Sequence, residues 1–267
     1  MIVFPNAKIN IGLHVVSKRP DGYHNLETVF YPVQLFDALE MAETGITGIS
    51  FSGLPVEGPP NENLVMKAYQ ILKEDFGLPP VQFHLHKNIP VGAGLGGGSS
   101  DAAFTLKMLN NYFKLQVSSE SLKKYAARLG ADCPFFIENK PAFAEGIGDR
   151  LSIINIDLSE FQMVVLKPEV SVSTAGAYKN VVPAIPSFKL QNLPVVPVEQ
   201  WKDMVKNDFE KSVFLRFPEI KRWKEKLVEM GAVYASMSGS GSAVFGIFRH
   251  LPTDFSNKIP ESILLIR

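Results

Sequence analysis

The pattern of apolar and polar positions predicts strands and helices in mixed order. Apolar residues from Ala7 to Leu13 alternate with polar or small ones, which is the period of a half-buried strand. The turn residues Arg-Pro-Asp-Gly at 19–22 and a β-rich run over 26–33 complete a predicted hairpin. Further strands are predicted where β-branched and apolar residues gather, over residues 81–85, 142–145, 161–166 and 243–248.

Helical spacing of apolar residues appears in four segments: 63–76, 100–113, 122–129 and 218–230. Gly130 and Gly231 stand where the last two of these helices would end. The proline-dotted stretch 181–197 predicts an irregular connection, and the small residues 236–242 predict a loop. There is no internal repeat, and this order of elements without strict strand–helix alternation predicts an α+β fold.

Composition and charge narrow the class of protein. The 267 residues suffice for one large domain or two ordinary ones. Lysine plus arginine equals aspartate plus glutamate at 27 each, so no basic excess indicates a nucleic-acid partner. No apolar run reaches the roughly 18 residues of a membrane span. The first ten residues have no basic lead and are interrupted by Pro5, so we do not expect them to be a secretory signal. A single cysteine, Cys133, excludes an internal disulfide. We therefore expect a cytoplasmic protein that acts on a small molecule.

The run VGAGLGGGSSDAA at residues 91–103 lies between a predicted strand and a predicted helix, which leaves no room for a slack linker. Clustered glycines permit positive φ angles and close approach of the backbone to a ligand. A loop that ends at a helix N-terminus directs free N–H groups and the positive end of the dipole at one point, which favours an anion such as phosphate. We predict a phosphate-binding loop, with tight packing as the alternative.

The common phosphate-binding motifs do not fit this run. A P-loop requires lysine after its second glycine, whereas Gly97 is followed by Gly98. The G-x-G-x-x-G spacing is matched, but the dinucleotide fold needs a strand–helix–strand unit, and residues 112–117 give no second core strand. Ser99 and Ser100 have two alternatives: they cap the helix, or they contact phosphate oxygens and a magnesium ion.

Two charged residues elsewhere are candidates for chemistry. Lys8 and Asn10 project from one face of the first strand. A lysine in an apolar strand ordinarily extends to solvent, and the alternative is a fixed cation beside a phosphate. Asp132 follows a predicted helix end and precedes Cys133-Pro-Phe-Phe. It is either an ordinary turn residue or a carboxylate held at the edge of the core, with Lys8 as its partner and a proton to accept.

Two further possibilities carry weaker support. His84 and His86 lie on one face of a predicted strand, but no cysteine or carboxylate cluster accompanies them to complete a metal site. Cys133 lacks an identifiable histidine partner for nucleophilic catalysis.

Three segments together resemble the motifs of the GHMP small-molecule kinases: residues 5–13, 90–103 and 238–243. The middle one is similar to the ATP-phosphate loop of that family. Three more resemble the branch that phosphorylates the 2-hydroxyl of a cytidine diphosphate-linked methylerythritol in isoprenoid biosynthesis: residues 21–28, 130–136 and 207–210. The resemblance runs nearly end to end. It implies a two-domain GHMP kinase fold with the active site in the cleft between an ATP-binding domain, 1–154, and a substrate-side domain, 155–267.

The resemblance also implies roles for residues, with ATP and Mg²⁺ as cofactors. Asp132 would be the catalytic carboxylate and Lys8 its cationic partner. The implied ATP-binding residues, of which Ser99 or Ser100 is also a candidate Mg²⁺ contact, are Asn63, Lys87, Pro90, Gly92, Gly94, Leu95, Gly96, Gly97, Gly98, Ser99 and Ser100. The implied substrate-binding residues are Asn10, Tyr23, His24, Tyr178, Gly239, Ser240 and Gly241. Tyr23 and Tyr178 would enclose the cytosine, and His24 would contact its polar edge. Ala93 departs from the glycine common in relatives, which a negative φ would tolerate.

Two alternatives remain beside this interpretation. One is another GHMP kinase, of the homoserine or mevalonate type, against which the aromatic pair Tyr23-His24 argues. The other is a non-catalytic GHMP-fold binding protein, which is expected to have lost Lys8 or Asp132. The expected partners are the small-molecule substrate and ATP, and we expect no nucleic-acid or membrane partner. The expected oligomeric state is a monomer or a weak homodimer.

Overall fold

The computed structural model describes residues 1–179, 181–260 and 264–266, and within them the strands form three four-stranded sheets. Contacts divide the chain into two compact units. Unit 1 comprises residues 1–8, 32–91 and 96–140, and unit 2 comprises residues 9–31, 92–95 and 141–267. The units are interleaved along the chain, so each is built from separate segments. The domain boundary expected between residues 154 and 155 stays a prediction.

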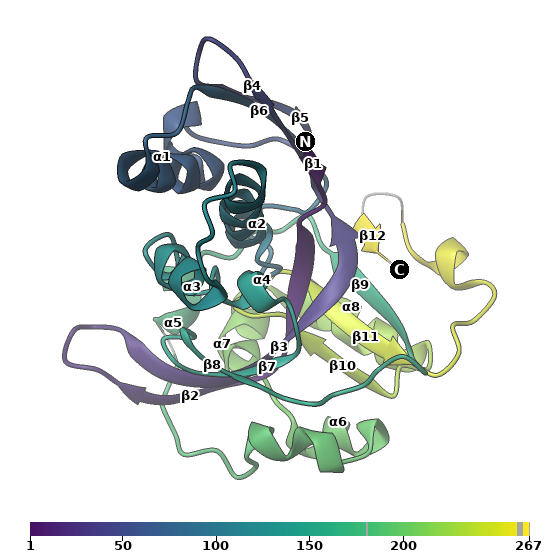
Figure 1. Cartoon of the computed structure of the whole chain (residues 1–267). Coiled ribbons are helices and arrows are strands. Elements are labelled where there is room, and N and C mark those ends of the chain that lie inside the picture. The colour runs from purple at the N-terminus through teal and green to yellow at the C-terminus, as the bar shows by residue number, and fades with distance from the viewer. Residues whose placement is uncertain (180, 261–263, 267) are drawn as a thin grey trace. The chain divides into compact units, whose positions relative to one another are not determined.

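Unit 1 contains a sheet of strand order β1-β4-β6-β5 and four helices (Figure 1). The strands are β1 (Ile2–Val3), β4 (Ala38–Glu43), β5 (Gly48–Gly53) and β6 (Val81–Lys87). β6 pairs antiparallel with β4 and parallel with β5. The helices are α1 (Leu64–Phe76), α2 (Gly97–Tyr112), α3 (Ser119–Ala127) and α4 (Phe135–Glu138).

Local capping sets the ends of these helices. The Asn63 side chain accepts a hydrogen bond from the Val65 N–H at the start of α1, and Gly77 ends that helix in the left-handed conformation. Ser118 caps α3 in the same manner as Asn63. By contrast, α2 begins after Gly96, whose φ is +70° and which offers no side-chain cap.

Unit 2 holds most of the sheet β2-β3-β7-β8 and all of the sheet β10-β11-β9-β12. The strands of the first sheet are β2 (Asn6–Lys18), β3 (His24–Phe36), β7 (Ala142–Gly146) and β8 (Arg150–Ile153). Those of the second are β9 (Gln162–Lys167), β10 (Tyr234–Met237), β11 (Val244–Phe248) and β12 (Leu264–Ile266). The helices are α5 (Thr174–Tyr178), α6 (Trp201–Met204), α7 (Phe209–Arg216) and α8 (Pro218–Glu229). Short 3-10 turns are η1 (Pro60–Glu62), η2 (Leu190–Val195), η3 (Val198–Gln200) and η4 (Phe255–Lys258).

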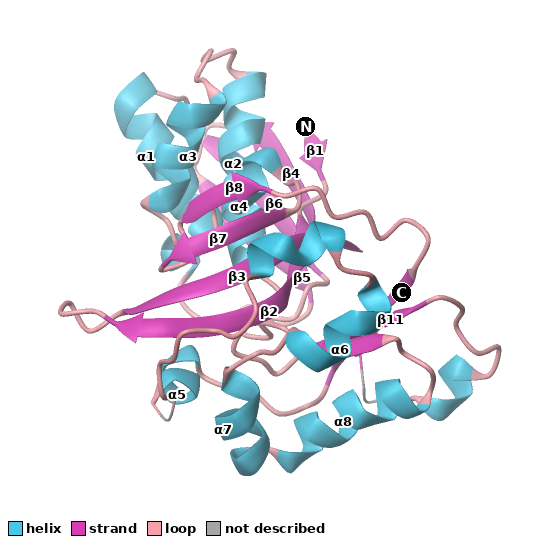
Figure 2. Cartoon of the chain, turned by 90° about the horizontal axis from the view of Figure 1, so that it is seen from below, coloured by secondary structure: helices cyan, strands magenta, loops and turns pink. Residues whose placement is uncertain are grey.

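The helix α8 packs on β10 and β11 through its apolar stripe (Figure 2). Ile220 and Leu227 of this stripe are fully buried in a cluster that also contains Phe209 and Phe248. Polar residues on the opposite face account for the strong amphipathic pattern in the sequence.

The predicted α+β class is confirmed, with the following differences. α2 begins at Gly97 rather than Ser100, because glycines enter the first turn. α3 is Ser119–Ala127 rather than 122–129, since Ser118 is its cap. The predicted loop 236–242 begins two residues later, because Ser236 and Met237 pair with β11 as part of β10. The backbone hydrogen bonds to β11 extend β10 through Ser236 and Met237, although the sequence there has no alternating strand pattern. Of the helices among the described residues, none has the length and apolar character to cross a bilayer.

Candidate active site

Lys8 and Asp132 form an ion pair within unit 1. Lys8 belongs to β2, and only 3% of its surface is exposed. Its ammonium Nζ lies 3.3 Å from Oδ2 of Asp132, whose side chain is 35% exposed. The alternative in which Lys8 extends to solvent is therefore wrong. A partly accessible carboxylate therefore stands beside a buried cation.

The turn that carries Asp132 is held by backbone hydrogen bonds and by two buried aromatic rings. It follows α3 and leads directly into α4, where Phe135 and Phe136 are buried. The Cys133 N–H donates to the carbonyl of Gly130 at 3.1 Å, and the Phe136 N–H donates to the carbonyl of Cys133 at 3.2 Å. These bonds and the buried rings hold the carboxylate at the edge of the core.

The side chain of Lys8 runs against the start of α2. A methyl group at Gly96 would approach Lys8 Cε to 3.1 Å and Phe136 Cζ to 3.0 Å. Gly96 is the residue before a helix of 16 residues, whose first N–H groups have no partner within the helix. The lysine and the positive end of the helix dipole therefore meet at one place, which attracts an anion.

The glycine loop adopts conformations that require glycine. Gly92, Gly94 and Gly96 have φ angles of +66°, +78° and +70°. Ala93 is absent from the residues with positive φ, so a side chain is tolerated there. The loop is divided between the units: residues 92–95 cluster with unit 2, and those from Gly96 onward with unit 1.

Ser99 and Ser100 lie inside the first turn of α2, and Gly96 holds the N-cap position, so the capping alternative is wrong for both serines. The hydroxyl Oγ of Ser100 is buried and has no hydrogen-bond partner among the described residues. A buried hydroxyl without a partner near a helix N-terminus fits a loop that receives an oxygen-rich ligand.

The serine–glycine loop, residues 238–241, is tied to the first half of the glycine loop within unit 2. Ser238 Oγ donates to the carbonyl of Gly94 at 2.8 Å, and the Ala243 N–H donates to the carbonyl of Ala93 at 3.1 Å. A methyl group at Gly94 would lie 2.1 Å from the carbonyl oxygen of Ser238. The structure therefore brings two segments predicted as separate motifs into one piece of backbone.

Asn10 lies beside this loop. Its N–H donates to Ser238 Oγ at 3.2 Å, and its side chain donates to Thr28 Oγ1 at 3.0 Å. A methyl group at Gly239 would approach Asn10 Oδ1 to 3.1 Å. Asn10, Gly239 and the adjoining Ser240 and Gly241 are thus close together, as their predicted shared role requires. Ser240 Oγ also contacts Thr174 Oγ1 at 3.2 Å.

Aromatic side chains gather on the same unit. The rings of His24 and Tyr178 stack with their centroids 4.9 Å apart and an interplanar angle of 20°. Tyr178 also contacts Phe209 edge-on, at 4.7 Å and 82°. Tyr23 is 63% exposed, so its ring is accessible to a ligand. The structure brings His24 and Tyr178 together; the enclosure of a base between Tyr23 and Tyr178 stays a prediction.

Lys87 is buried in an ion-pair cluster that the sequence analysis did not predict. Its ammonium contacts Asp37, and it lies 2.7 Å from Asp101 Oδ2. Burial raises the pKa of Asp101 to about 7, against the lowering effect of Lys87, and Asp37 adds to the rise. A methyl group at Gly97 would come within 3.1 Å of Lys87 Nζ, so the cluster lies directly beneath the start of α2.

The side-chain oxygen of Asn63 thus caps α1, and the Lys87 ammonium is engaged in the ion pairs with Asp37 and Asp101. Their role on the nucleoside side of ATP stays a prediction. The only sequence signals for the cluster were an aspartate, Asp37, in an apolar run and Asp101 directly after the two serines.

The weaker alternatives gain no support. His84 and His86 both contact Ser52 of β5, at 2.9 Å each. Within the described residues no group of histidine, cysteine and carboxylate side chains is arranged to hold a metal. Cys133 is buried, and desolvation raises the pKa of its thiol to about 12, which opposes a nucleophilic thiolate.

Comparison with known proteins shows the family to which this chain belongs. The GHMP kinases N terminal domain matches residues 63–140, and the GHMP kinases C terminal domain matches residues 198–261. The 4-diphosphocytidyl-2-C-methyl-D-erythritol kinase of Bacteroides fragilis is 54% identical over 252 residues, which cover 93% of this chain and 92% of the relative.

Solved structures agree with the sequence match. A crystal structure of 4-(cytidine 5'-diphospho)-2C-methyl-D-erythritol kinase has a TM-score of 0.80 and 35% identity, covering 92% of this chain and 90% of that one. The Methanococcus jannaschii mevalonate kinase shares the fold, with a TM-score of 0.74 and 14% identity over 100% of this chain and 96% of its own. The chain belongs to the GHMP kinase family, in the branch of the 4-diphosphocytidyl-2-C-methyl-D-erythritol kinases.

Proposed function

We propose that the protein transfers the γ-phosphoryl group of ATP to the 2-hydroxyl of 4-diphosphocytidyl-2-C-methyl-D-erythritol. The products are the 2-phosphate and ADP, on the route to isopentenyl diphosphate. The observation that carries this proposal is the convergence of three features in unit 1: the Lys8 ammonium, the Asp132 carboxylate 3.3 Å from it, and the start of α2 against the Lys8 stem. Phosphoryl transfer depends on positioning and charge stabilisation, and these groups supply both.

The glycine loop and the first turn of α2 are proposed to bind the phosphates of ATP. The residues are those assigned above from Pro90 to Ser100. The residues fit such a ligand, because the N–H groups at the helix start have no helical partners and the buried Ser100 hydroxyl has none among the described residues. A bound Mg²⁺ would neutralise charge on the transferring phosphoryl group, and Ser99 or Ser100 is its candidate protein contact.

Asp132 is proposed to accept the proton of the acceptor hydroxyl while the new O–P bond forms and the bond from the γ-phosphorus to the β-phosphate oxygen breaks. Its partial exposure leaves room for the hydroxyl, whereas the burial of Lys8 fixes the cation. Lys8 is proposed to stabilise the charge that develops on the phosphoryl oxygens.

The acceptor side is proposed to consist of Asn10, Tyr23, His24, Tyr178 and the serine–glycine loop. The accessible ring of Tyr23 offers a face for a base, and the His24 imidazole has polar edges for its exocyclic groups. Homoserine and mevalonate carry no base, so they would gain nothing from stacking on these aromatic rings. Asn63 and Lys87 are proposed on the nucleoside side of ATP, where the Asn63 oxygen caps α1 and the Lys87 ammonium is paired with Asp101 of α2. The domain boundary at residues 154 and 155, the cytoplasmic location and the monomeric or weakly dimeric state stay predictions.

The direct test is to incubate the protein with Mg-ATP and 4-diphosphocytidyl-2-C-methyl-D-erythritol and to detect the 2-phosphate by mass spectrometry. Homoserine and mevalonate serve as competing acceptors in parallel reactions. Turnover of either one without turnover of the cytidine-linked acceptor would contradict the substrate assignment. ATP binding without turnover of any acceptor would favour the non-catalytic binding protein.

A further inference from the structure

The segment Asn207-Asp208-Phe209-Glu210 contacts four separate parts of unit 2. It enters α7 beside β2: the Leu13 N–H donates to the carbonyl of Lys206 at 2.9 Å, and the Asp208 N–H donates to the carbonyl of Leu13 at 2.8 Å. None of its residues was assigned a role above. Its side chains reach the serine–glycine loop, β2, the aromatic pair and β10.

Asn207 holds the serine–glycine loop. Its buried carboxamide donates two hydrogen bonds of 2.8 Å, to the carbonyls of Met237 and Gly239. These carbonyls flank Ser238, the residue that links this loop to Gly94. The Asn207 Oδ1 in turn accepts the Phe209 N–H at 3.0 Å. One side chain therefore fixes the backbone on both sides of Ser238.

Phe209 holds the aromatic pair. Its ring is 2% exposed and meets Tyr178 edge-on, and the Tyr178 ring also stacks on His24. Tyr178 is the last residue of α5, a helix of five residues that is too short to fix a large side chain by itself. The Phe209 ring thus buttresses the Tyr178 ring from one side.

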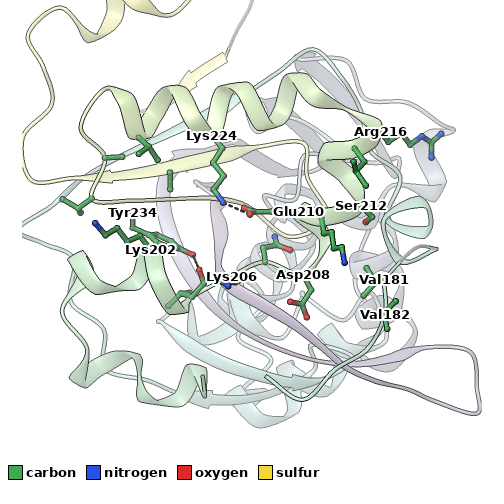
Figure 3. A pocket seen from close by; sticks show the side chains of 18 residues that line it. Val181, Val182, Lys202, Lys206, Asp208, Glu210, Ser212, Arg216, Lys224 and Tyr234 are labelled. Carbon is green, nitrogen blue, oxygen red and sulfur yellow. Dashed lines mark hydrogen bonds and ion pairs between the residues drawn. The ribbon is translucent and has the colours of Figure 1, made fainter. Parts of the chain in front are cut away.

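Asp208 and Glu210 hold the strands on either side. Asp208 Oδ2 accepts the Val15 N–H of β2 at 2.8 Å. Glu210 Oε1 accepts the Met237 N–H at 2.9 Å, and its Oε2 accepts from Lys224 at 2.6 Å. Figure 3 shows Lys224 reaching from α8 to Glu210. Asn207, Asp208 and Glu210 also line a cavity of about 1030 Å³.

We propose that Asn207 and Phe209 are positioning residues for the acceptor: Asn207 sets the serine–glycine loop, and Phe209 sets the Tyr178 ring. The inference rests on the proposed function and deepens it, because it names one positioning residue for each of two parts of the proposed acceptor site. A loop of glycine and serine has no large side chains to hold its own conformation, so its geometry must come from neighbours. Misplacement of a positioning group by about 1 Å costs on the order of 100-fold in rate, which makes such supports kinetically visible.

The experiment compares two positioning variants with two matched controls. Asn207→Asp replaces two donors with a carboxylate that repels the Met237 and Gly239 carbonyls. Its control is Asn110→Asp, because Asn110 makes a similar backbone clamp on Val117 in unit 1. Phe209→Leu removes the ring that meets Tyr178. Its control is Phe255→Leu, because Phe255 is equally buried in the same core but meets Phe248 instead.

Steady-state kinetics with separate titration of ATP and acceptor provide the first measurement. For Asn207→Asp we expect kcat to fall by at least about tenfold with the KM for ATP within about twofold of wild type. For Phe209→Leu we expect the acceptor KM to rise by about tenfold with kcat largely retained. Both controls are expected to keep wild-type kinetics, and Phe255→Leu should lose as much unfolding free energy as Phe209→Leu.

A second measurement is independent of the acceptor. Amide hydrogen exchange of peptides that cover residues 236–243 should be faster in Asn207→Asp than in wild type and unchanged in Asn110→Asp. If the wild type uses another alcohol, the proposed function fails, and the same ratios are measured with that alcohol. The positioning proposal itself is overturned if Asn207→Asp exchanges like wild type, or if Phe209→Leu and Phe255→Leu give the same acceptor KM.

Discussion

The Lys8 ammonium lies 3.3 Å from the Asp132 carboxylate, and the two partners differ in exposure: the lysine is buried, whereas about a third of the aspartate side chain is accessible. A symmetric buried pair would neutralise itself and leave no open position for a substrate. Here the cation is fixed by the core and by Gly96, while the carboxylate presents one side to solvent. This asymmetry is what a proton acceptor with a permanent counter-charge requires, and it leads to the first two predictions.

Replacement of Asp132 by asparagine is expected to lower kcat by about 100-fold to 10,000-fold, the range for loss of a general base. The KM for ATP should change little, because Asp132 lies at the acceptor hydroxyl in the proposed mechanism. Steady-state kinetics with Asp203→Asn as an exposed control provide the measurement. A near wild-type rate would remove Asp132 from its proposed role.

Replacement of Lys8 by methionine keeps most of the unbranched side chain, which becomes one atom shorter, and removes its charge. We expect kcat to fall by about 100-fold or more, as for loss of one preorganised electrostatic contact. The unfolding free energy should stay close to wild type, because the accessible Asp132 can be solvated when its partner is gone. Kinetics and urea unfolding of Lys8→Met beside the exposed control Lys221→Met test this. Loss of stability in proportion to activity would instead indicate a structural lysine.

The tie between the glycine loop and the serine–glycine loop predicts a difference between two alanine variants. Gly94→Ala would place its methyl 2.1 Å from the Ser238 carbonyl oxygen, whereas Gly92→Ala meets nothing within 4 Å. Both positions have positive φ and lose about 1–2 kcal/mol from that alone. Gly94→Ala should lose a further 1–3 kcal/mol or so from overpacking. Equal unfolding free energies of the two variants in urea would show that the loops are not tied.

The buried Asp101 predicts an unusual pH dependence of stability. Its pKa is raised to about 7 in the folded chain, so between about pH 4 and 7 the folded state holds a proton that the unfolded state has lost. The stabilising contribution of protonated Asp101 to the folded state is therefore fully present below about pH 4 and is lost as the pH rises through 7. A pKa difference of about 3 corresponds to about 4 kcal/mol at most.

Asp101→Asn removes this proton equilibrium. The unfolding free energy of the variant relative to wild type is expected to rise between about pH 4 and 7 and then to level off. Urea unfolding at four pH values measures the difference, with Asp203→Asn as the control for loss of one charge. A difference that does not change with pH would show that Asp101 is ionised throughout.

The buried thiol of Cys133 predicts chemical inertness. Because its pKa is raised to about 12 and the residue is buried, little thiolate forms at pH 8. Native protein should react with a thiol-specific disulfide reagent much more slowly than urea-unfolded protein, as absorbance of the released thiolate will show. Rapid reaction in the native state would contradict the placement of Cys133.

Much of the fold was predictable where periodicity was strong and local. The apolar stripes of α1 and α8, the Gly231 stop and the alternation of β2 lie within short windows, and these elements form as predicted. The prediction of Gly130 as the stop of α3 is wrong, because that helix ends at Ala127 with Arg128 as its cap. The prediction of a half-buried β2 is also wrong, because both faces of the strand are buried over residues 6–15. The strands β4 and β5 were not predicted, because their support comes from pairing with β6 across the chain rather than from their own pattern. For the same reason, Ser236 and Met237 were assigned to a loop.

By itself, the sequence determined which residue types were available for chemistry: a glycine-rich loop before a helix, a lysine in an apolar strand and an aspartate after a helix end. These are local features, set by backbone freedom and hydrophobic pattern. Only the tertiary structure decided that Lys8 is buried against Gly96, that Ser238 is bonded to Gly94, and that Lys87 lies between two carboxylates. Such relationships depend on long-range packing, in which burial removes water and makes each charge depend on the partner that the fold places beside it.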